Sequence, residues 1–205
     1  MDNTRNPYYE QAMHDAEQMV RFTIVERGML HPESYGDPKQ DRRVRWVLSQ
    51  MKGRVLDIGC GIGYILTRYS GEGVGLDYNP YHIAVAQFNN QRDNQAFYCV
   101  DADYGIPFPD KSFTVAVLAE VLEHMVFSHA TRLLKDTARC ATDGVILTFP
   151  FMREGAYNLP MVESMEHKWS TTREVIDRLV REAGLKATVV ETLCDETFLG
   201  MVVGR

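Results

Sequence analysis

The chain has 205 residues, of which 45% are hydrophobic and 24% are charged. These values suit one globular domain, and no stretch is long and apolar enough to cross a membrane. The net charge of −6, with Arg42, Arg43 and Arg45 as the one basic cluster, argues against long nucleic acid as a partner. The N-terminus lacks the apolar core of a signal peptide and the four cysteines form no C-x-x-C pair, so we expect a cytoplasmic protein with free thiols.

The spacing of apolar residues predicts alternating helices and strands. Two helices come first, over residues 7–29 and 41–51. Strands are expected near residues 55, 97 and 115 and over 73–77, 144–149, 186–192 and 197–203, with helices from the glycine-rich turn to residue 70 and over 80–90, 128–140 and 172–183. This alternation predicts a parallel sheet with helices on both faces, and the short link between the last two strands predicts an antiparallel hairpin.

The most informative segment is residues 55–64, V-L-D-I-G-C-G-I-G-Y. A short apolar strand leads to Asp57, and Gly59, Gly61 and Gly63 follow at alternate positions. Glycines at the end of a strand allow a sharp turn and a close approach of ligand, and the helix that follows offers free N–H groups. The spacing differs from the G-x-G-x-x-G of dinucleotide sites, and Asp57 suits a cationic ligand better than a pyrophosphate.

This D-x-G-x-G-x-G pattern resembles the first motif of the class I methyltransferases that use S-adenosylmethionine (SAM). Three further segments follow in matching order: the strand that ends at Asp77, the strand that ends at Asp101, and P-F-P-D-K-S-F over residues 107–113. Thr114 stands where the family usually has an acid. The resemblance runs from about residue 53 to the end. It implies a three-layer Rossmann-like α/β fold with a mostly parallel seven-stranded sheet and an antiparallel C-terminal hairpin.

The resemblance also implies a set of cofactor contacts. Asp77 is expected to bind both ribose hydroxyls, Tyr78 to lie against the adenine, and Asp101 to read the adenine amino group. The complete predicted set is Asp57, Gly59, Cys60, Gly61, Gly63, Asp77, Tyr78, Asp101, Ala102 and Leu118.

Acidic and imidazole side chains follow the fourth predicted strand. Glu120, Glu123 and His124 stand at i, i+3 and i+4, so in a helix they share one face. Together with His167 they form a candidate site for a divalent metal such as Mg²⁺. The pattern resembles the metal site of the small-RNA 3′-end 2′-O-methyltransferases, and its E-x-x-E-H part resembles the ubiquinone-pathway O-methyltransferases. In a metal-free reading, His124 or His167 acts as a general base and Glu120 and Glu123 balance the charge of a helix N-terminus.

The candidate catalytic residues are therefore His124, His167 and Glu120. We expect a single domain in which residues 1–52 form a helical lid over the SAM-binding core, residues 53–205, although the first helices can instead simply pack on the outside. The long segment over residues 150–169 carries aromatic and methionine side chains and is expected to bind the acceptor.

The predicted function is transfer of the methyl group of SAM to a small molecule at oxygen, with S-adenosylhomocysteine as the product, by a monomer or a homodimer. Two alternatives stay open. One is metal-assisted 2′-O-methylation of an RNA end. The other, from a different class, is an NAD-binding oxidoreductase or a non-catalytic nucleotide-binding module.

Overall fold

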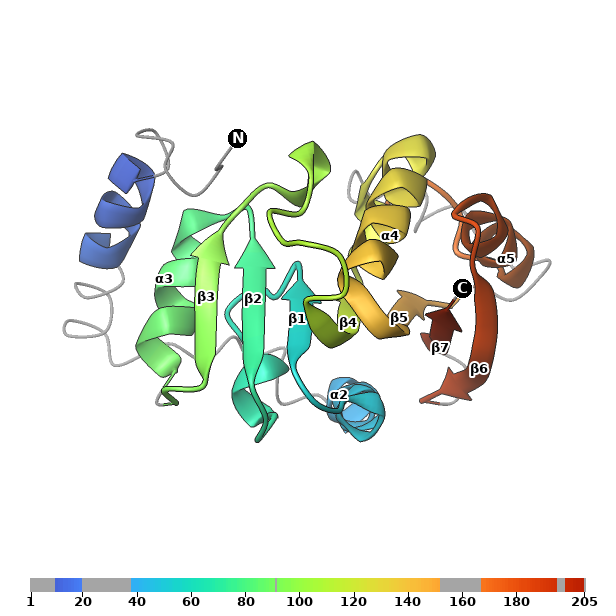
Figure 1. Ribbon diagram of the computed structural model, residues 1–205, viewed down its shortest axis with the longest axis horizontal. Coiled ribbons are helices and arrows are strands. Elements are labelled where there is room, and N and C mark those ends of the chain that lie inside the picture. The colour runs from blue at the N-terminus through green and yellow to red at the C-terminus, as the bar shows by residue number, and fades with distance from the viewer. Residues whose placement is uncertain (1–9, 20–37, 91, 152–166, 195–197, 205) are drawn as a thin grey trace.

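A seven-stranded sheet forms the centre of the computed structural model, which describes residues 10–19, 38–90, 92–151, 167–194 and 198–204 (Figure 1). The strands are β1 (Val55–Ile58), β2 (Gly73–Asp77), β3 (Gln95–Cys99), β4 (Phe113–Ala119), β5 (Ala141–Pro150), β6 (Lys186–Leu193) and β7 (Phe198–Gly204). Their order in the sheet is β3-β2-β1-β4-β5-β7-β6. The first five pair in parallel, and β7 runs antiparallel to both β5 and β6. The predicted mostly parallel sheet with an antiparallel C-terminal hairpin is confirmed.

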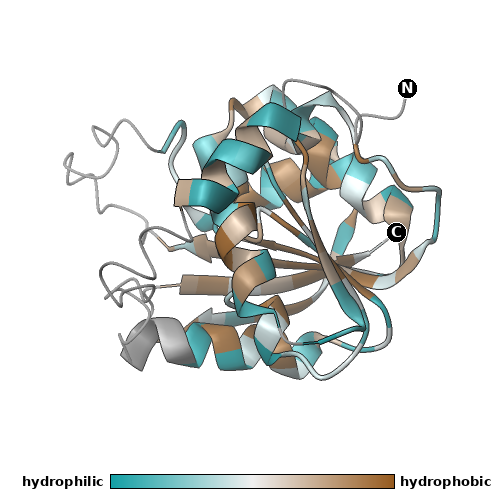
Figure 2. Ribbon diagram, turned by 90° about the vertical axis from the view of Figure 1, so that its left-hand side faces the viewer, coloured by the Kyte–Doolittle hydropathy of each residue, from teal (hydrophilic) through white to brown (hydrophobic). Residues whose placement is uncertain are grey.

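Helices cover both faces of this sheet. They are α2 (Pro38–Gln50), α3 (Pro80–Asn89), α4 (Phe127–Cys140) and α5 (Arg173–Glu182), with a further helical segment over residues 10–19. Figure 2 shows the largely apolar strands enclosed between helices. In the part of the chain that the structure describes, no helix has the length and apolar character needed to cross a membrane.

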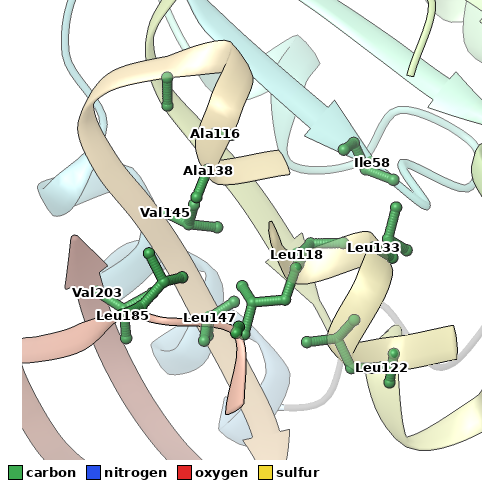
Figure 3. Packing of buried hydrophobic residues seen from close by; sticks show 14 of the residues in the cluster. Ile58, Ala116, Leu118, Leu122, Leu133, Ala138, Val145, Leu147, Leu185 and Val203 are labelled. Atoms are coloured by element: carbon green, nitrogen blue, oxygen red, sulfur yellow. The ribbon is translucent and has the colours of Figure 1, made fainter. Parts of the chain in front are cut away.

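Successive residues of each central strand point to opposite layers, as the pleat of a β-strand requires. Ile58, Leu118 and Leu147 belong to one buried cluster, which also contains Leu122 and Leu133 (Figure 3). This cluster includes the apolar faces of α4 and α5. The alternate strand residues, among them Val117 and Ile146, belong to a second cluster, which includes the apolar faces of α2 and α3. Both faces of the central parallel strands β1, β2 and β4 are therefore largely buried.

The segment after the glycine-rich turn differs from the prediction. A helix was expected up to residue 70, but the chain forms turns followed by a three-residue 3₁₀ helix, η3 (Leu66–Arg68). Gly61 and Gly63 have φ values of +53° and +78°, and a right-handed helix cannot pass through residues in this conformation. The glycines that form the turn thus delay the start of regular structure.

The N-terminal helices contact the core in two separate places. On the helix over residues 10–19, Ala16 packs against Ala84 and Val85 of α3. Helix α2 instead contacts β5 and β7. Residues 1–9 and 20–37 of the predicted lid lie outside the described residues, so the lid stays a prediction.

Candidate active site

The glycine-rich turn begins where β1 ends. Gly59 has φ +68°, and a Cβ atom added there would lie 2.5 Å from Cγ2 of Val121. Its N–H donates to the carbonyl of Leu76 at 2.7 Å, so the turn is tied to β2. Both the backbone conformation and the close neighbour require glycine at this position.

Asp77, at the end of β2, supports the same turn. One carboxylate oxygen accepts a hydrogen bond from the N–H of Gly61 at 2.9 Å. The other accepts from the N–H of Asn79 at 2.9 Å and lies 3.3 Å from Nδ1 of His82. The carboxylate predicted to bind ribose is therefore held at the edge of the turn, 7% exposed.

Asp57 is the most deeply buried acid of this region, 1% exposed at the end of β1. Its Oδ2 has no hydrogen-bond partner among the described residues. Burial raises the pKa of its carboxyl group from 3.8 to about 7, with a further rise from the negative charge of Asp77 and an opposing effect from Arg43. A carboxylate in this position is unfavourable alone and favourable beside a cation.

The remaining predicted cofactor residues differ in exposure. Tyr78 is 69% exposed, whereas the side chains of Cys60 and Leu118 are buried in the two apolar clusters. Any contact that these two make with a ligand must therefore come from their backbone. Asp101 accepts a hydrogen bond from the N–H of Asp103 and begins the 3₁₀ helix η4 (Ala102–Tyr104). A cavity of about 810 Å³ starts at Ala102 and lies between η4 and α4.

The acids after β4 do not share one helical face. Glu120 has a left-handed backbone with φ +58°, and only a three-residue 3₁₀ helix, η5 (Leu122–His124), follows. The condition for a shared helical face is therefore not met, because the backbone of Glu120 is left-handed and lies outside η5. Glu120 instead lies with its Oε1 4.0 Å from Nη1 of Arg43, and a hydrogen bond from Thr148 favours its ionised form.

Glu123 is 0% exposed, and neither of its carboxylate oxygens has a hydrogen-bond partner within the described parts of the chain. Burial raises the pKa of both Glu123 and Glu120, and the charge of Glu120 adds to the rise at Glu123. This pair of carboxyl groups resists full ionisation unless positive charge is supplied.

The structure brings Glu123 together with both predicted histidines. One potential ligand atom from each of Glu123, His124 and His167 lies within 4.8 Å of the others. The two imidazole rings are 5.0 Å apart at their centroids. Glu120, the fourth predicted ligand, is not part of this group.

The segment around Trp169 holds His167 close to Glu123 and His124. The N–H of Lys168 donates to the carbonyl of Glu123 at 2.7 Å, and the indole N–H of Trp169 donates to the carbonyl of Met125 at 3.1 Å. The Trp169 ring also lies against Phe127 and Phe149. His167 thus enters the site on a backbone that is hydrogen-bonded to the residues after β4.

Arg43 is a site residue that sequence reasoning missed. It lies on α2 and is 8% exposed, with its Nη1 3.2 Å from Oγ1 of Thr148 at the end of β5. The available signal was helical spacing, since Arg43 precedes the buried Val47 and Met51 by four and eight residues and so lies on the same face of the helix.

Comparison with known proteins agrees with this geometry. Residues 56–149 match the family model described as a methyltransferase domain. No curated protein sequence matches the chain.

Several solved structures share the fold. A chain of the complex between the Haloferax volcanii Trm112 methyltransferase activator and the putative methyltransferase has a TM-score of 0.70 and 18% identity, with 98% of each chain covered. Magnesium protoporphyrin IX methyltransferase from Synechocystis PCC 6803, solved with bound S-adenosylhomocysteine, has a TM-score of 0.66 and 17% identity, with 91% of this chain and 99% of that chain covered. The [4+2]-cyclase SpnF has a TM-score of 0.64 and 23% identity, with 77% of this chain covered and 61% of the cyclase, so the present chain spans less than two thirds of that protein.

The family match, the strand order and the glycine-rich turn support enzymatic activity. Residues 56–149 match the methyltransferase domain family, and the strand order is that of the class I, Rossmann-like fold of SAM-dependent methyltransferases.

Proposed function

We propose that the chain transfers the methyl group of SAM to an oxygen atom of a small-molecule acceptor. In this reaction the bond between sulfur and the methyl carbon breaks, a bond from the acceptor oxygen to that carbon forms, and the hydroxyl proton leaves. The products are S-adenosylhomocysteine, a methyl ether and a proton. The observation that carries the choice of oxygen is the group formed by Glu123, His124 and His167 beside the end of β4.

The seat proposed for SAM follows the carboxyl ends of β1, β2 and β3. When bound, SAM supplies an electrophilic methyl group, so the protein needs chiefly to orient the reactants. Asp57 offers an unpaired carboxylate oxygen to the positive end of the ligand. Asp77 and Asp101 follow the next two strands, where the ribose and the adenine would extend.

The Glu123–His124–His167 group can assist the acceptor in either of two ways. An imidazole can accept the hydroxyl proton as a general base. A divalent cation held by the same three side chains would instead lower the pKa of the hydroxyl. The residues fit a cation, because both oxygens of Glu123 are buried without a hydrogen-bond partner among the described residues. One carboxylate with two imidazoles suits Zn²⁺, Co²⁺ or Fe²⁺ better than Mg²⁺, which prefers oxygen ligands.

The ribose hydroxyl at an RNA end is the second candidate acceptor, because the same group of side chains suits it equally. The net charge of −6 weighs against it. The methyltransferase match over residues 56–149 weighs against an NAD-dependent function.

The test is methyl transfer from radiolabelled SAM to a panel of phenols, catechols, amines and short RNAs, with product analysis. We expect a labelled methyl ether of a small hydroxylated acceptor. Labelled RNA termini with unlabelled small molecules would favour the second candidate. Labelled amines alone would refute transfer to oxygen.

A parallel assay after exhaustive chelation separates the two roles of the Glu123–His124–His167 group. Loss of activity, restored by Zn²⁺ or Co²⁺, supports a metal. Undiminished turnover removes the metal and leaves His124 or His167 as the base.

A further inference from the structure

Polar side chains of α4 hold the loop that connects β3 to β4. Four of them are spaced by three, four and three residues and so share one face of the helix: His129, Arg132, Asp136 and Arg139. Nδ1 of His129 lies 2.8 Å from Oδ2 of Asp103, and Nη2 of Arg132 donates to both the carboxylate and the carbonyl oxygen of Asp103. Asp136 and Arg139 bind the later part of the loop. The reaction proposed above uses none of these contacts.

Asp103 is joined directly to Asp101, the acid expected to read the adenine amino group. The N–H of Asp103 donates to Oδ1 of Asp101 at 3.0 Å, and this hydrogen bond caps the start of η4. Oδ2 of Asp101 has no hydrogen-bond partner among the described residues, so it is available to a ligand. The position of this oxygen therefore depends on where η4 is held.

Apolar packing contributes little to the position of η4. None of its three residues is buried, and only Ala102 packs against an apolar cluster. Tyr104 is 81% exposed. The cavity of about 810 Å³ lies between η4 and α4, so this part of the loop does not rest on closely packed side chains. Within the described parts of the chain, η4 is therefore connected to α4 chiefly through Asp103.

We infer that Asp103, held by His129 and Arg132, is a positioning residue that fixes the Asp101 carboxylate and so sets the selectivity of the site for an adenine base. The inference rests on the proposed binding of SAM and adds to it residues of α4 that act through Asp103. Adenine offers an amino group to an acceptor, whereas hypoxanthine has a carbonyl oxygen at the same position. A carboxylate that is held in place favours the first base and disfavours the second, and a displaced carboxylate distinguishes them less.

The test compares S-adenosylhomocysteine with S-inosylhomocysteine, which carries hypoxanthine in place of adenine, by isothermal titration calorimetry. We expect the wild-type protein to bind the adenosyl compound about 10- to 100-fold more tightly, the range for a hydrogen bond to a charged group. Asp103→Ala should weaken binding of the adenosyl compound by about 3- to 10-fold, because its effect on Asp101 is indirect, and should leave the affinity for the inosyl compound nearly unchanged. Arg132→Met should act in the same direction and less strongly, since His129 still holds the Asp103 carboxylate. Added to Asp103→Ala, it should have no further effect.

Asp110→Ala is the matched control, because Asp110 belongs to the same loop and pairs with Arg139 of α4 but lies beyond η4. It should change neither affinity. Asp103→Asn, which keeps the shape of the side chain and loses its charge, serves as a second variant if circular dichroism shows that Asp103→Ala does not fold.

Equal weakening of both ligands by the Asp103 variants overturns the inference, and so does unchanged affinity for both. An additive effect of Arg132→Met on Asp103→Ala also overturns it. Equal affinity of the wild-type protein for the two compounds would refute the adenine contact of Asp101 and the inference with it. Failure of the wild-type protein to bind either compound would instead refute the proposed cofactor.

Discussion

Replacing Asp57 by Asn should stabilise the cofactor-free protein and, at the same time, weaken its binding of SAM. Asp57 is 1% exposed, and its Oδ2 has no hydrogen-bond partner among the described residues. The ionised carboxylate therefore opposes folding until a cation binds beside it. Asn has nearly the same shape and no charge, so it removes this penalty together with the attraction for the ligand.

The magnitude follows from the pKa of this carboxyl group, which burial raises from 3.8 to about 7. At about 1.4 kcal/mol for each pKa unit, the difference of roughly 3 corresponds to at most about 4 kcal/mol. A buried amide has its own unmet hydrogen bonds, so we expect a gain of about 1 to 3 kcal/mol in the free energy of unfolding.

The gain should depend on pH in a defined direction. Below about pH 4 the Asp57 carboxyl is protonated in both the folded and the unfolded wild-type protein, so Asn offers no advantage. Between pH 4 and 7 the folded state holds the proton more tightly, and wild-type stability falls as the pH rises. The advantage of Asp57→Asn should therefore grow over this range and stay constant above pH 7.

Urea unfolding at pH 5 and pH 8 measures the stability change, and calorimetry with SAM measures the binding change. Asp143→Asn is the control, because Asp143 is exposed and paired with Lys52, so it should bring no stabilisation. An Asp57→Asn protein that is less stable than wild type at pH 8, or one that binds SAM as well as wild type, would contradict the proposed role of this carboxylate.

Three further variants test other parts of the site. Asp77→Asn should weaken SAM binding by about tenfold or more, because it removes the charge-assisted hydrogen bonds that we propose to the ribose. Calorimetry measures this, and Asp93→Asn at an exposed position is the control. Unchanged affinity would refute the ribose contact. Gly59→Ala should lower the free energy of unfolding by about 1 to 3 kcal/mol, since φ is +68° and the new Cβ would meet Val121 at 2.5 Å. Gly204→Ala is the control and should be nearly neutral, because nothing lies within 4 Å of the added atom. Equal effects of the two substitutions would contradict the geometry of the turn. Glu123→Gln should abolish binding of Zn²⁺ or Co²⁺, measured in competition with a coloured chelator, and should leave SAM binding intact. Glu174→Gln on the surface of α5 is the control. Retained metal binding by Glu123→Gln would exclude Glu123 as a ligand.

Local sequence patterns were sufficient for the sheet and for the position of the turn. Short apolar or β-forming runs marked the strands, and the acid-flanked glycines marked the end of β1. The meeting of His124 with His167 also follows from topology, because the two residues come after β4 and β5, which are neighbours in the sheet. Segments that leave adjacent parallel strands emerge at the same edge.

The differences arise where a local pattern is overridden by backbone conformation or by distant packing. The left-handed backbone of Glu120 keeps it out of the group formed by Glu123, His124 and His167, although a helix would have placed it on one face with Glu123 and His124. The contact of Arg43 with Thr148 joins residues 105 positions apart, and no local periodicity encodes such a pair. The burial of Arg43 beside Thr148 can be seen only once α2 lies against the sheet.

The most direct test of the central claim is calorimetry of the wild-type protein with SAM, S-adenosylhomocysteine and NAD under the same conditions. An acid-flanked glycine turn with Asp57 and Asp77 at its edges predicts saturable binding of SAM and S-adenosylhomocysteine and no binding of NAD. Binding of NAD alone, or of none of the three, would contradict it.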